Sequence, residues 1–291
     1  MTTINTTPVQ PLISRITASI IRRVQGSRKS RVRGLTRILS AGRRFLPEYR
    51  GAIQLADSTR FWIDTQAQPV DFWVFYTGDF EPSITWILRQ HTKPGAHCLD
   101  IGANVGHYAM RMATWAGSSG RVAAFEPDPD IAARIQRSVN ESGYAHVKVI
   151  PNAVSDSEGT RTFYIGHKSV YSALDPSQVQ QITRSVTLET VTIDDFLQRE
   201  GWTRLDVIKI DTQGNDCQCI LGGKTAIRTH RPFIVFEYQH DTPADLASQV
   251  FDLLGACGYT LKTLSPYGKL SPFKREAIQS GYVDIACFPS P

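Results

Sequence analysis

Two carboxylates and a pair of glycines stand where short apolar stretches end in the first half of the chain. Asp100 lies in "CLDIGANVG" (98–106), directly ahead of Gly102 and Gly106, and Glu126 ends the stretch "VAAFE". A dinucleotide turn uses three glycines to bring its backbone against a pyrophosphate. This turn has two glycines, and its preceding acid would repel a phosphate. The pattern favours a ligand that carries an ammonium group and hydroxyls.

S-adenosylmethionine fits that description, because it has an amino acid end and a ribose but no phosphate. A carboxylate at the end of the second strand, Glu126, can accept two hydrogen bonds from a ribose diol. Asn152 of "PNAV" ends the third strand. Its side-chain amide is placed to meet the ribose or the adenine, with a turn-forming role as the alternative.

Three polar residues at later strand ends are candidates for catalysis on an acceptor hydroxyl. Asp211 ends "LDVIKID" and is the first candidate for positioning or deprotonating the acceptor; capping of the following helix is the alternative. Glu237 could hold a hydroxyl, and His240 could accept a proton or be a solvated loop residue. Asp211, Glu237 and Asp194 could also bind a divalent metal, but no spacing demands it, so we predict no metal site.

The elements that must position these residues alternate regularly along the chain. Strand-like stretches at 97–101, 121–126, 147–153, 205–211 and 232–238 are separated by amphipathic helical patterns, and 159–191 reads as inserted β-structure. This alternation predicts an α/β fold with a mostly parallel, doubly wound sheet covered on both faces. The last two stretches, "YTLKTL" and "YVDIACF", predict an antiparallel pair at the sheet end, with 265–281 as a loop or turn.

The first 96 residues divide into two predicted segments ahead of the main domain (97–291). Residues 1–50 form a basic arm, in which the apolar spacing of 12–24 predicts an amphipathic helix. That helix either packs on the main domain or lies on an anionic membrane surface. Residues 51–96 predict a β-hairpin or meander, including "VDFWVFY" (70–76), followed by a helix at 82–90 that leads into the core.

From about residue 52 to 240 the chain resembles the FkbM family of S-adenosylmethionine-dependent methyltransferases. The motifs that carry the resemblance are "GDFEP" (78–82), "CLDIGANVGHYA" (98–109), "AFEPDP" (124–129), "NAVSDSEGTRTFYIG" (152–166), "VTIDDF" (191–196), "DVIKIDTQGND" (206–216) and "VFEY" (235–238). The chain departs from the family where an acid usually precedes the glycine of "KIDxxG", because it has Gln213 there.

The resemblance implies a class I, Rossmann-like fold with a seven-stranded sheet and small β additions. It also implies an O-methyltransferase that acts on a hydroxyl of a secondary metabolite, a glycan or a lipid-linked sugar. The cofactor-binding residues that it implies lie in the first four motifs: Glu81, Asp100, Gly102, Asn104, Gly106, Glu126, Asn152 and Ala153.

Charge and cysteine usage limit the other function classes. Residues 1–50 hold eleven Lys and Arg against one Glu, which gives the arm a charge of +10; the whole chain carries +5, so residues 51–291 carry −5. An acidic main domain argues against nucleic acid as a partner, although a nucleic-acid methyltransferase and a non-catalytic S-adenosylmethionine-binding module docked through the arm remain alternatives. Five cysteines without paired spacing argue against disulfides and structural zinc. We expect a cytoplasmic protein, with peripheral membrane contact through residues 12–50 as an option, and no oligomeric state is predicted.

Overall fold

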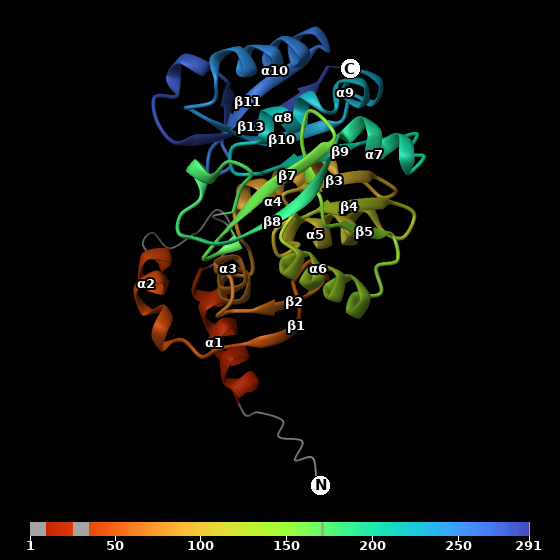
Figure 1. Cartoon of the computed structure of the whole chain (residues 1–291). Helices are drawn as coiled ribbons and strands as arrows, with labels where there is room; N and C mark the ends of the chain where they lie inside the picture. Colours follow the sequence, from red (N-terminus) through yellow and green to blue (C-terminus); the bar gives the residue numbers. More distant parts are fainter. Residues whose placement is uncertain (1–9, 26–34, 170–171, 291) are drawn as a thin grey trace.

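An eight-stranded sheet forms the centre of the computed structural model, which describes residues 10–25, 35–169 and 172–290 (Figure 1). Across the sheet the strands follow the order β5 (Val147–Ile150), β4 (Arg121–Phe125), β3 (His97–Ile101), β9 (Val207–Ile210), β10 (Phe233–Gln239), β13 (Tyr282–Pro289), β11 (Tyr259–Leu264) and β12 (Leu270–Pro272). The five strands from β5 to β10 are parallel to one another. The mostly parallel sheet is therefore as predicted.

Both faces of the sheet are covered, because alternate side chains of its strands enter two separate apolar clusters. Cys98 belongs to one cluster and its neighbour Leu99 to the other. Four helices pack on the first face: α3 (Pro69–Thr77), α4 (Pro82–His91), α5 (His107–Ala116) and α6 (Pro129–Ser142). Four pack on the second: α7 (Ile193–Arg199), α8 (Asp216–Leu221), α9 (Lys224–His230) and α10 (Ala244–Ala256). This is the predicted doubly wound arrangement.

The direction in which the chain builds the sheet reverses between β3 and β9. From β3 the chain proceeds outward to β4 and β5, and it then returns to place β9 and β10 on the other side of β3. At such a switch point the turns after the two central strands diverge and leave a crevice at their carboxyl ends, where ligands bind in open α/β sheets. The turns concerned begin at Gly102 and Asp211.

The far end of the sheet holds one strand more than the seven predicted. β13 pairs antiparallel with both β10 and β11, as expected. Residues 265–281, expected to be a loop or turn, contain β12, which pairs antiparallel with β11 in a register that places Leu264 opposite Leu270. A tight turn makes this possible, because Gly268 takes a positive φ of 75° and its N–H donates to Ser265 O at 2.7 Å.

The predicted β additions are present. β1 (Arg50–Gln54) and β2 (Arg60–Asp64) form an antiparallel hairpin. The block inserted after β5 is a three-stranded sheet of β6 (Ala153–Val154), β8 (Ile182–Val191) and β7 (Gly159–Gly166). Through this insertion the chain passes over the carboxyl ends of the central strands (Figure 1).

The prediction of β-structure for residues 70–76 is wrong, because this stretch is most of helix α3. Pro69 occupies its first turn, and Gly78 ends it with a φ of 83° while donating its N–H to Val74 O. Periodicity could not distinguish the two structures, because a short run that is buried on several sides reads as apolar throughout.

The predicted helix of the basic arm is α1 (Gln10–Gln25), which is followed by α2 (Leu35–Gly42) and the short helix η2 (Arg43–Phe45). Helix α1 packs on α3. Ser14 Oγ donates to Glu48 O at 2.6 Å, Ala18 is 2% exposed, and Arg22 Nε donates to Phe75 O at 3.0 Å. One face of the helix thus rests on the main domain. Within the described ranges, no helix is both long and apolar enough to cross a membrane.

Candidate active site

A cavity of about 400 Å³ opens at the switch point between β3 and β9. The turns after β3, β4 and β9 contribute to it, together with α3, the start of α5 and the inserted sheet. The predicted site residues that line it are Glu81, Gly102, Asn104, Glu126, Asn152, Ala153, Asp211 and Glu237. Residues that are far apart in the sequence therefore meet at one place, as the positions at strand ends led us to expect.

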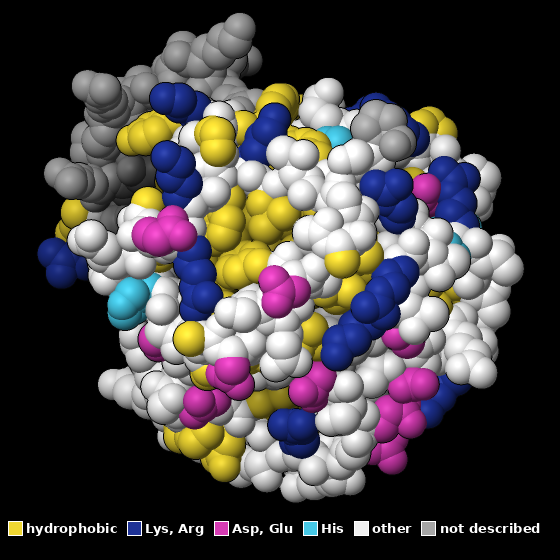
Figure 2. Space-filling model, turned by 90° about the horizontal axis from the view of Figure 1, so that it is seen from above, with side chains coloured by type: hydrophobic (Ala, Val, Ile, Leu, Met, Phe, Trp, Pro, Cys, Tyr) yellow, Lys and Arg dark blue, Asp and Glu magenta, His cyan; other side chains and the backbone are white. Residues whose placement is uncertain are grey.

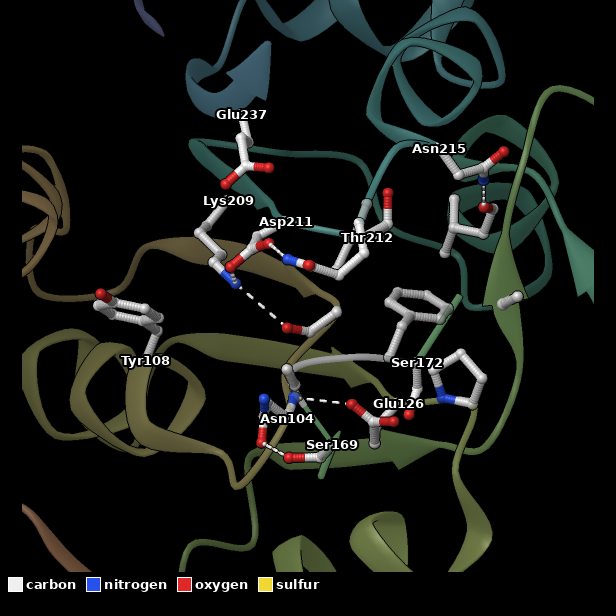
Figure 3. Close-up of a pocket in the computed structure, with 18 of the residues that line it drawn as sticks. Asn104, Tyr108, Glu126, Ser169, Ser172, Lys209, Asp211, Thr212, Asn215 and Glu237 are labelled. Atoms are coloured by element: carbon white, nitrogen blue, oxygen red, sulfur yellow. Dashed lines mark hydrogen bonds and ion pairs between the residues drawn. The ribbon is translucent and has the colours of Figure 1, made fainter. Parts of the chain in front are cut away.

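Figure 3 shows two ends of this cavity. Asn104, Glu126 and Ser169 lie at one end, which we call the Glu126 end. Lys209, Asp211 and Glu237 lie at the other, which we call the Lys209 end. The two ends differ in what holds their polar groups in place.

Main-chain amides hold the carboxylate of Glu126. Oε2 accepts from Asn104 N at 2.7 Å, and Oε1 accepts from Asp128 N at 2.9 Å. Burial raises the pKa of Glu126 to about 7, although these two N–H groups act in the opposite direction. Each carboxylate oxygen keeps a further lone pair, so Glu126 can still accept hydrogen bonds from a diol.

The turn after β3 requires glycines because other parts of the protein pack closely against it. A Cβ on Gly102 would lie 1.9 Å from Asp211 O, so only glycine allows the β3 and β9 turns to approach so closely. Gly106 has a φ of 83° and lies against Ile135 of α6, outside the cavity wall. Gly102 lines the cavity, but the closest contact that its missing side chain permits is with the protein itself. Asn104, also at positive φ (50°), accepts from Ser169 Oγ at 2.7 Å.

Asp100, predicted to touch the ligand, is instead the partner of a buried lysine. It is fully buried and does not line the cavity. Lys209 stands opposite it in the register of β3 and β9, with Nζ 3.5 Å from Asp100 Oδ1. The same Nζ lies 3.6 Å from Asp211 Oδ2 and donates to Gly102 O at 3.1 Å. Asp100 therefore contacts Lys209, which lines the cavity, and does not line the cavity itself.

Lys209 is the residue of the site that sequence reasoning missed, although it stands in the "KID" motif. Burial would lower its pKa, but Asp211, Asp100 and Glu81 together raise that pKa above the ordinary value, so the ammonium stays charged. Two signals could have identified it. A lysine in an otherwise apolar parallel strand is unusual, and the two-residue period of a strand places Lys209 on the same face as Asp211.

Asp211 is a partly exposed carboxylate at the Lys209 end. Its side chain is 33% exposed, and Oδ1 accepts from Gln213 Nε2 at 3.0 Å. The structure does not show helix capping, the alternative proposed for Asp211: the N-cap residue of α8 is Asn215, which makes no side-chain cap hydrogen bond, and Asp216 Oδ2 accepts from Thr212 N and Thr212 Oγ1 in the turn before the helix. Gln213, where the family usually has an acid, takes a positive φ of 54° and keeps a contact with Asp211.

Glu237 and Glu81 complete the charged wall. Burial, with Asp211 and Asp216 nearby, raises the pKa of Glu237 to about 9, so its carboxyl is largely protonated at neutral pH. Burial and Asp211 raise the pKa of Glu81 to about 7, and Glu81 Oε2 accepts from Tyr108 at 2.9 Å. Asp284 stands opposite Glu237 in β13, and burial together with Glu81 raises its pKa to about 7. Several carboxyl groups thus share the charge of one lysine.

Three other residues named from the sequence have different surroundings from those expected. His240 lies on the exposed turn after β10 and does not line the cavity. Asp194, considered as a metal ligand, accepts from the N–H groups of Thr225 and Ala226. Asn152 does line the cavity, but its Nδ2 donates to Glu189 O at 3.0 Å. The described residues contain no cluster of three or more His, Cys, Asp or Glu side chains suited to a metal ion.

The family model for the methyltransferase FkbM domain matches residues 100–261, which is more than half of the chain. The chain belongs to the FkbM methyltransferase family. The resemblance seen in the motifs is thereby confirmed, and family membership supports S-adenosylmethionine as the cofactor of this FkbM protein.

Two relatives with assigned names are similar to this FkbM protein. The 2-O-methyltransferase NoeI of Sinorhizobium fredii is 28% identical over 160 residues, which cover 50% of this chain and 64% of NoeI. The hexuronic acid methyltransferase AglP of Haloferax volcanii is 28% identical over 168 residues, which cover 57% of this chain and 66% of AglP. The matched region thus spans just under two thirds of each relative's length.

Among solved structures, the methyltransferase FkbM from Methylobacillus flagellatus KT matches with a TM-score of 0.44 and 14% identity. This match covers 67% of this chain and 44% of that protein.

Proposed function

We propose that this protein transfers a methyl group from S-adenosylmethionine to a hydroxyl of a sugar. Membership of the FkbM methyltransferase family supports the reaction class. The names of the two relatives, a 2-O-methyltransferase and a hexuronic acid methyltransferase, support a sugar as the acceptor. The observation that carries the proposal is the cavity at the switch point, which brings a diol-binding carboxylate and a polar acceptor wall together.

The residues of the cavity suit S-adenosylmethionine. Glu126, held by two main-chain N–H groups, can accept from the ribose hydroxyls. The remaining carboxyl groups outnumber Lys209, the one Lys or Arg among the described residues that line the cavity. An excess of carboxyl groups favours a ligand with sulfonium and ammonium charges, and such a cation would in turn lower their pKa values. At the Glu126 end, the backbone of Asn104 and Gly102 also lines the cavity.

At the Lys209 end we assign the acceptor chemistry to Asp211 and Glu237. S-adenosylmethionine supplies an electrophilic methyl group when it is bound. Asp211 accepts the proton that the acceptor hydroxyl loses, because its carboxylate is accessible and is oriented by Gln213 and Lys209. Glu237, protonated at neutral pH, donates a hydrogen bond to a neighbouring sugar oxygen.

The charge of this wall favours a hydroxyl over a carboxylate as the methylated group. Asp211 and Glu81 line the cavity, and the charge of Lys209 is already shared between Asp100 and Asp211, while Glu237 is protonated at neutral pH and adds no charge. A carboxylate group on the acceptor would be repelled by these like charges, and no unpaired cation among the described cavity residues would offset the repulsion. Among the acceptors suggested by the relatives, a neutral sugar hydroxyl therefore agrees best with the site.

The alternative functions receive less support from the molecule. Figure 2 shows one face on which Lys and Arg side chains are interspersed with Asp and Glu around a hollow whose floor is hydrophobic, without a continuous basic stripe for a phosphate backbone. A non-catalytic module would bind the cofactor but would have no use for the buried Lys209 and its carboxylates. Peripheral membrane contact is a separate proposal, which rests on α1 and on none of the cavity residues.

Two measurements test the proposed function. Calorimetry should show binding of S-adenosylmethionine, with thermal stabilisation of the protein. Transfer of a labelled methyl group should then be followed on neutral oligosaccharides and on their uronate counterparts. A methyl ether survives mild alkali, whereas a methyl ester is hydrolysed, so alkali-stable label on a neutral sugar is the expected product. No cofactor binding would refute the enzyme, and alkali-labile label on uronates would refute the hydroxyl as acceptor.

A further inference from the structure

The outer face of α1 carries aliphatic side chains that the rest of the molecule leaves uncovered. Leu12, Ile13, Ile16 and Ile20 are 64%, 51%, 52% and 57% exposed. At about 100° per residue these four positions fall within an arc of roughly 100° on the helix. We call them the α1 stripe. They form half of the large hydrophobic residues found exposed among the described residues, which makes the stripe a local feature.

The side chains that α1 buries differ from those that simple packing predicts, because its most exposed residues are large and aliphatic. The fully buried side chains, Ser14 and Ala18, are small, and Ile21 is partly buried against the main domain, whereas the four side chains of the α1 stripe point away from it. An amphipathic helix that served only to cover the core would bury its isoleucines. Arg22 anchors this orientation, because its guanidinium donates to the carbonyls of Val74 and Phe75 in α3.

Basic residues accompany the stripe. Arg15 lies on α1 between the stripe and the domain, and its Nη2 donates to Tyr49 Oη at 2.8 Å. A groove of about 700 Å³ beside α1 is lined by Arg15, Arg22 and Arg60, with Glu141 as the one acid. Exposed Phe45 in η2 carries the guanidinium of Arg44 over its ring, 4.7 Å from the centroid. Both α1 and η2 thus carry exposed apolar side chains with arginines beside them.

We propose that the α1 stripe and the arginines beside it dock the protein on an anionic phospholipid surface. Apolar side chains would enter the boundary between headgroups and acyl chains, and the exposed arginines Arg15 and Arg44 would meet the lipid phosphates. The charge of the segment decides between this occupant and a second copy of the chain. Residues 1–50 carry +10, so joining two such faces would bring like charges together, whereas an anionic bilayer attracts them.

Docking through α1 would also bring the side of the protein that holds the cavity toward the membrane surface. Helix α1 packs on α3, and Pro69 and Val70 of α3 line the cavity. Two helices, α1 and α3, thus lie between the docked face and the proposed site of methyl transfer. The docking proposal is nevertheless independent of the reaction, because it is tested without turnover.

The test is co-sedimentation of the full-length protein with vesicles of phosphatidylcholine alone, or of phosphatidylcholine mixed with phosphatidylglycerol. We expect binding to the anionic vesicles, weakened by salt, and a partition coefficient that falls at least about tenfold in the double variant Ile16→Ser/Ile20→Ser. Both side chains are exposed, so the thermal midpoint should not change. The matched control is Ile182→Ser/Tyr267→Ser, which removes two exposed apolar residues elsewhere and should leave partition unchanged.

Two outcomes would overturn the proposal. The first is equal partition of the α1 variant and the unaltered protein. The second is a wild-type protein that ignores anionic vesicles but forms a dimer that the α1 variant abolishes, which would assign the stripe to contact between copies.

Discussion

The two ends of the cavity reach the same result, a carboxyl group presented to a ligand, by different means. At the Glu126 end, main-chain N–H groups from two turns fix one carboxylate. At the Lys209 end, side-chain charges fix one another, because one ammonium lies between Asp100 and Asp211 while Glu237 and Glu81 stand close by. Substitution of a carboxylate held by the backbone should affect the function of that residue alone. Substitution of one member of a charge cluster should also alter the charge state and stability contribution of the residues next to it.

The largest effect is expected from Lys209→Met, which leaves the buried carboxylate of Asp100 without its cation. Breaking one side of a buried pair costs about 3–5 kcal/mol of unfolding free energy. The double variant Lys209→Met/Asp100→Asn should recover part of this loss, because both charges are then gone. Urea denaturation of the single and double variants measures the coupling; costs that add within about 0.5 kcal/mol would show that the pair is not coupled.

Asp211→Asn should lower turnover by about 10²- to 10⁴-fold, the usual contribution of a general base, and leave cofactor affinity nearly unchanged. Transfer kinetics and calorimetry together make this measurement. Full turnover with the acceptor would remove Asp211 from the proposed chemistry.

Glu126→Gln should weaken S-adenosylmethionine binding by about tenfold to a hundredfold, because hydrogen bonds to a charged carboxylate are worth about 1.5–3 kcal/mol. Glu276→Gln, at an exposed glutamate outside the cavity, is the matched control. Calorimetry gives both affinities. If the two variants bind alike, Glu126 does not hold the ribose.

The pH dependence of stability distinguishes the two ends above about pH 7, because the pKa of Glu126 is raised to about 7 and that of Glu237 to about 9. The folded-state pKa of Glu237, about 9, lies above its ordinary value of 4.5, so between these values the folded state binds more protons than the unfolded one. Glu237 therefore lowers stability as pH rises through that window. Glu237→Gln should flatten this part of the profile in denaturation measured across the window, and an unchanged slope would contradict the raised pKa.

The smallest effect is expected from His240→Ala, because this residue lies outside both ends of the cavity. Turnover and cofactor affinity should stay within about twofold of the unaltered protein, well below the contribution of a general base. A large loss of turnover would return His240 to the list of catalytic residues.

The positions at strand ends allowed the sequence to predict most of the site. Glu126, Asp211 and Glu237 each end an apolar strand-like stretch, and parallel strands present their carboxyl ends at one edge. The same reasoning failed for Asp100, because β3 continues to Ile101, so Asp100 stays within the sheet opposite Lys209 and is fully buried. The prediction of β-structure for residues 70–76 failed because a short, mostly apolar stretch shows neither the two-residue period of a strand nor the 3.6-residue period of a helix.

The sequence by itself determined the alternation of strands and helices, the family and the edge of the sheet at which the site lies. These are consequences of local pattern and of short motifs. Only the tertiary structure decided that Asp100 pairs with Lys209, that Gly102 makes room for the Asp211 carbonyl, and that the α1 stripe points outward. Each of these depends on which residues of distant segments are neighbours, and burial and charge act on those neighbours through space, not along the chain.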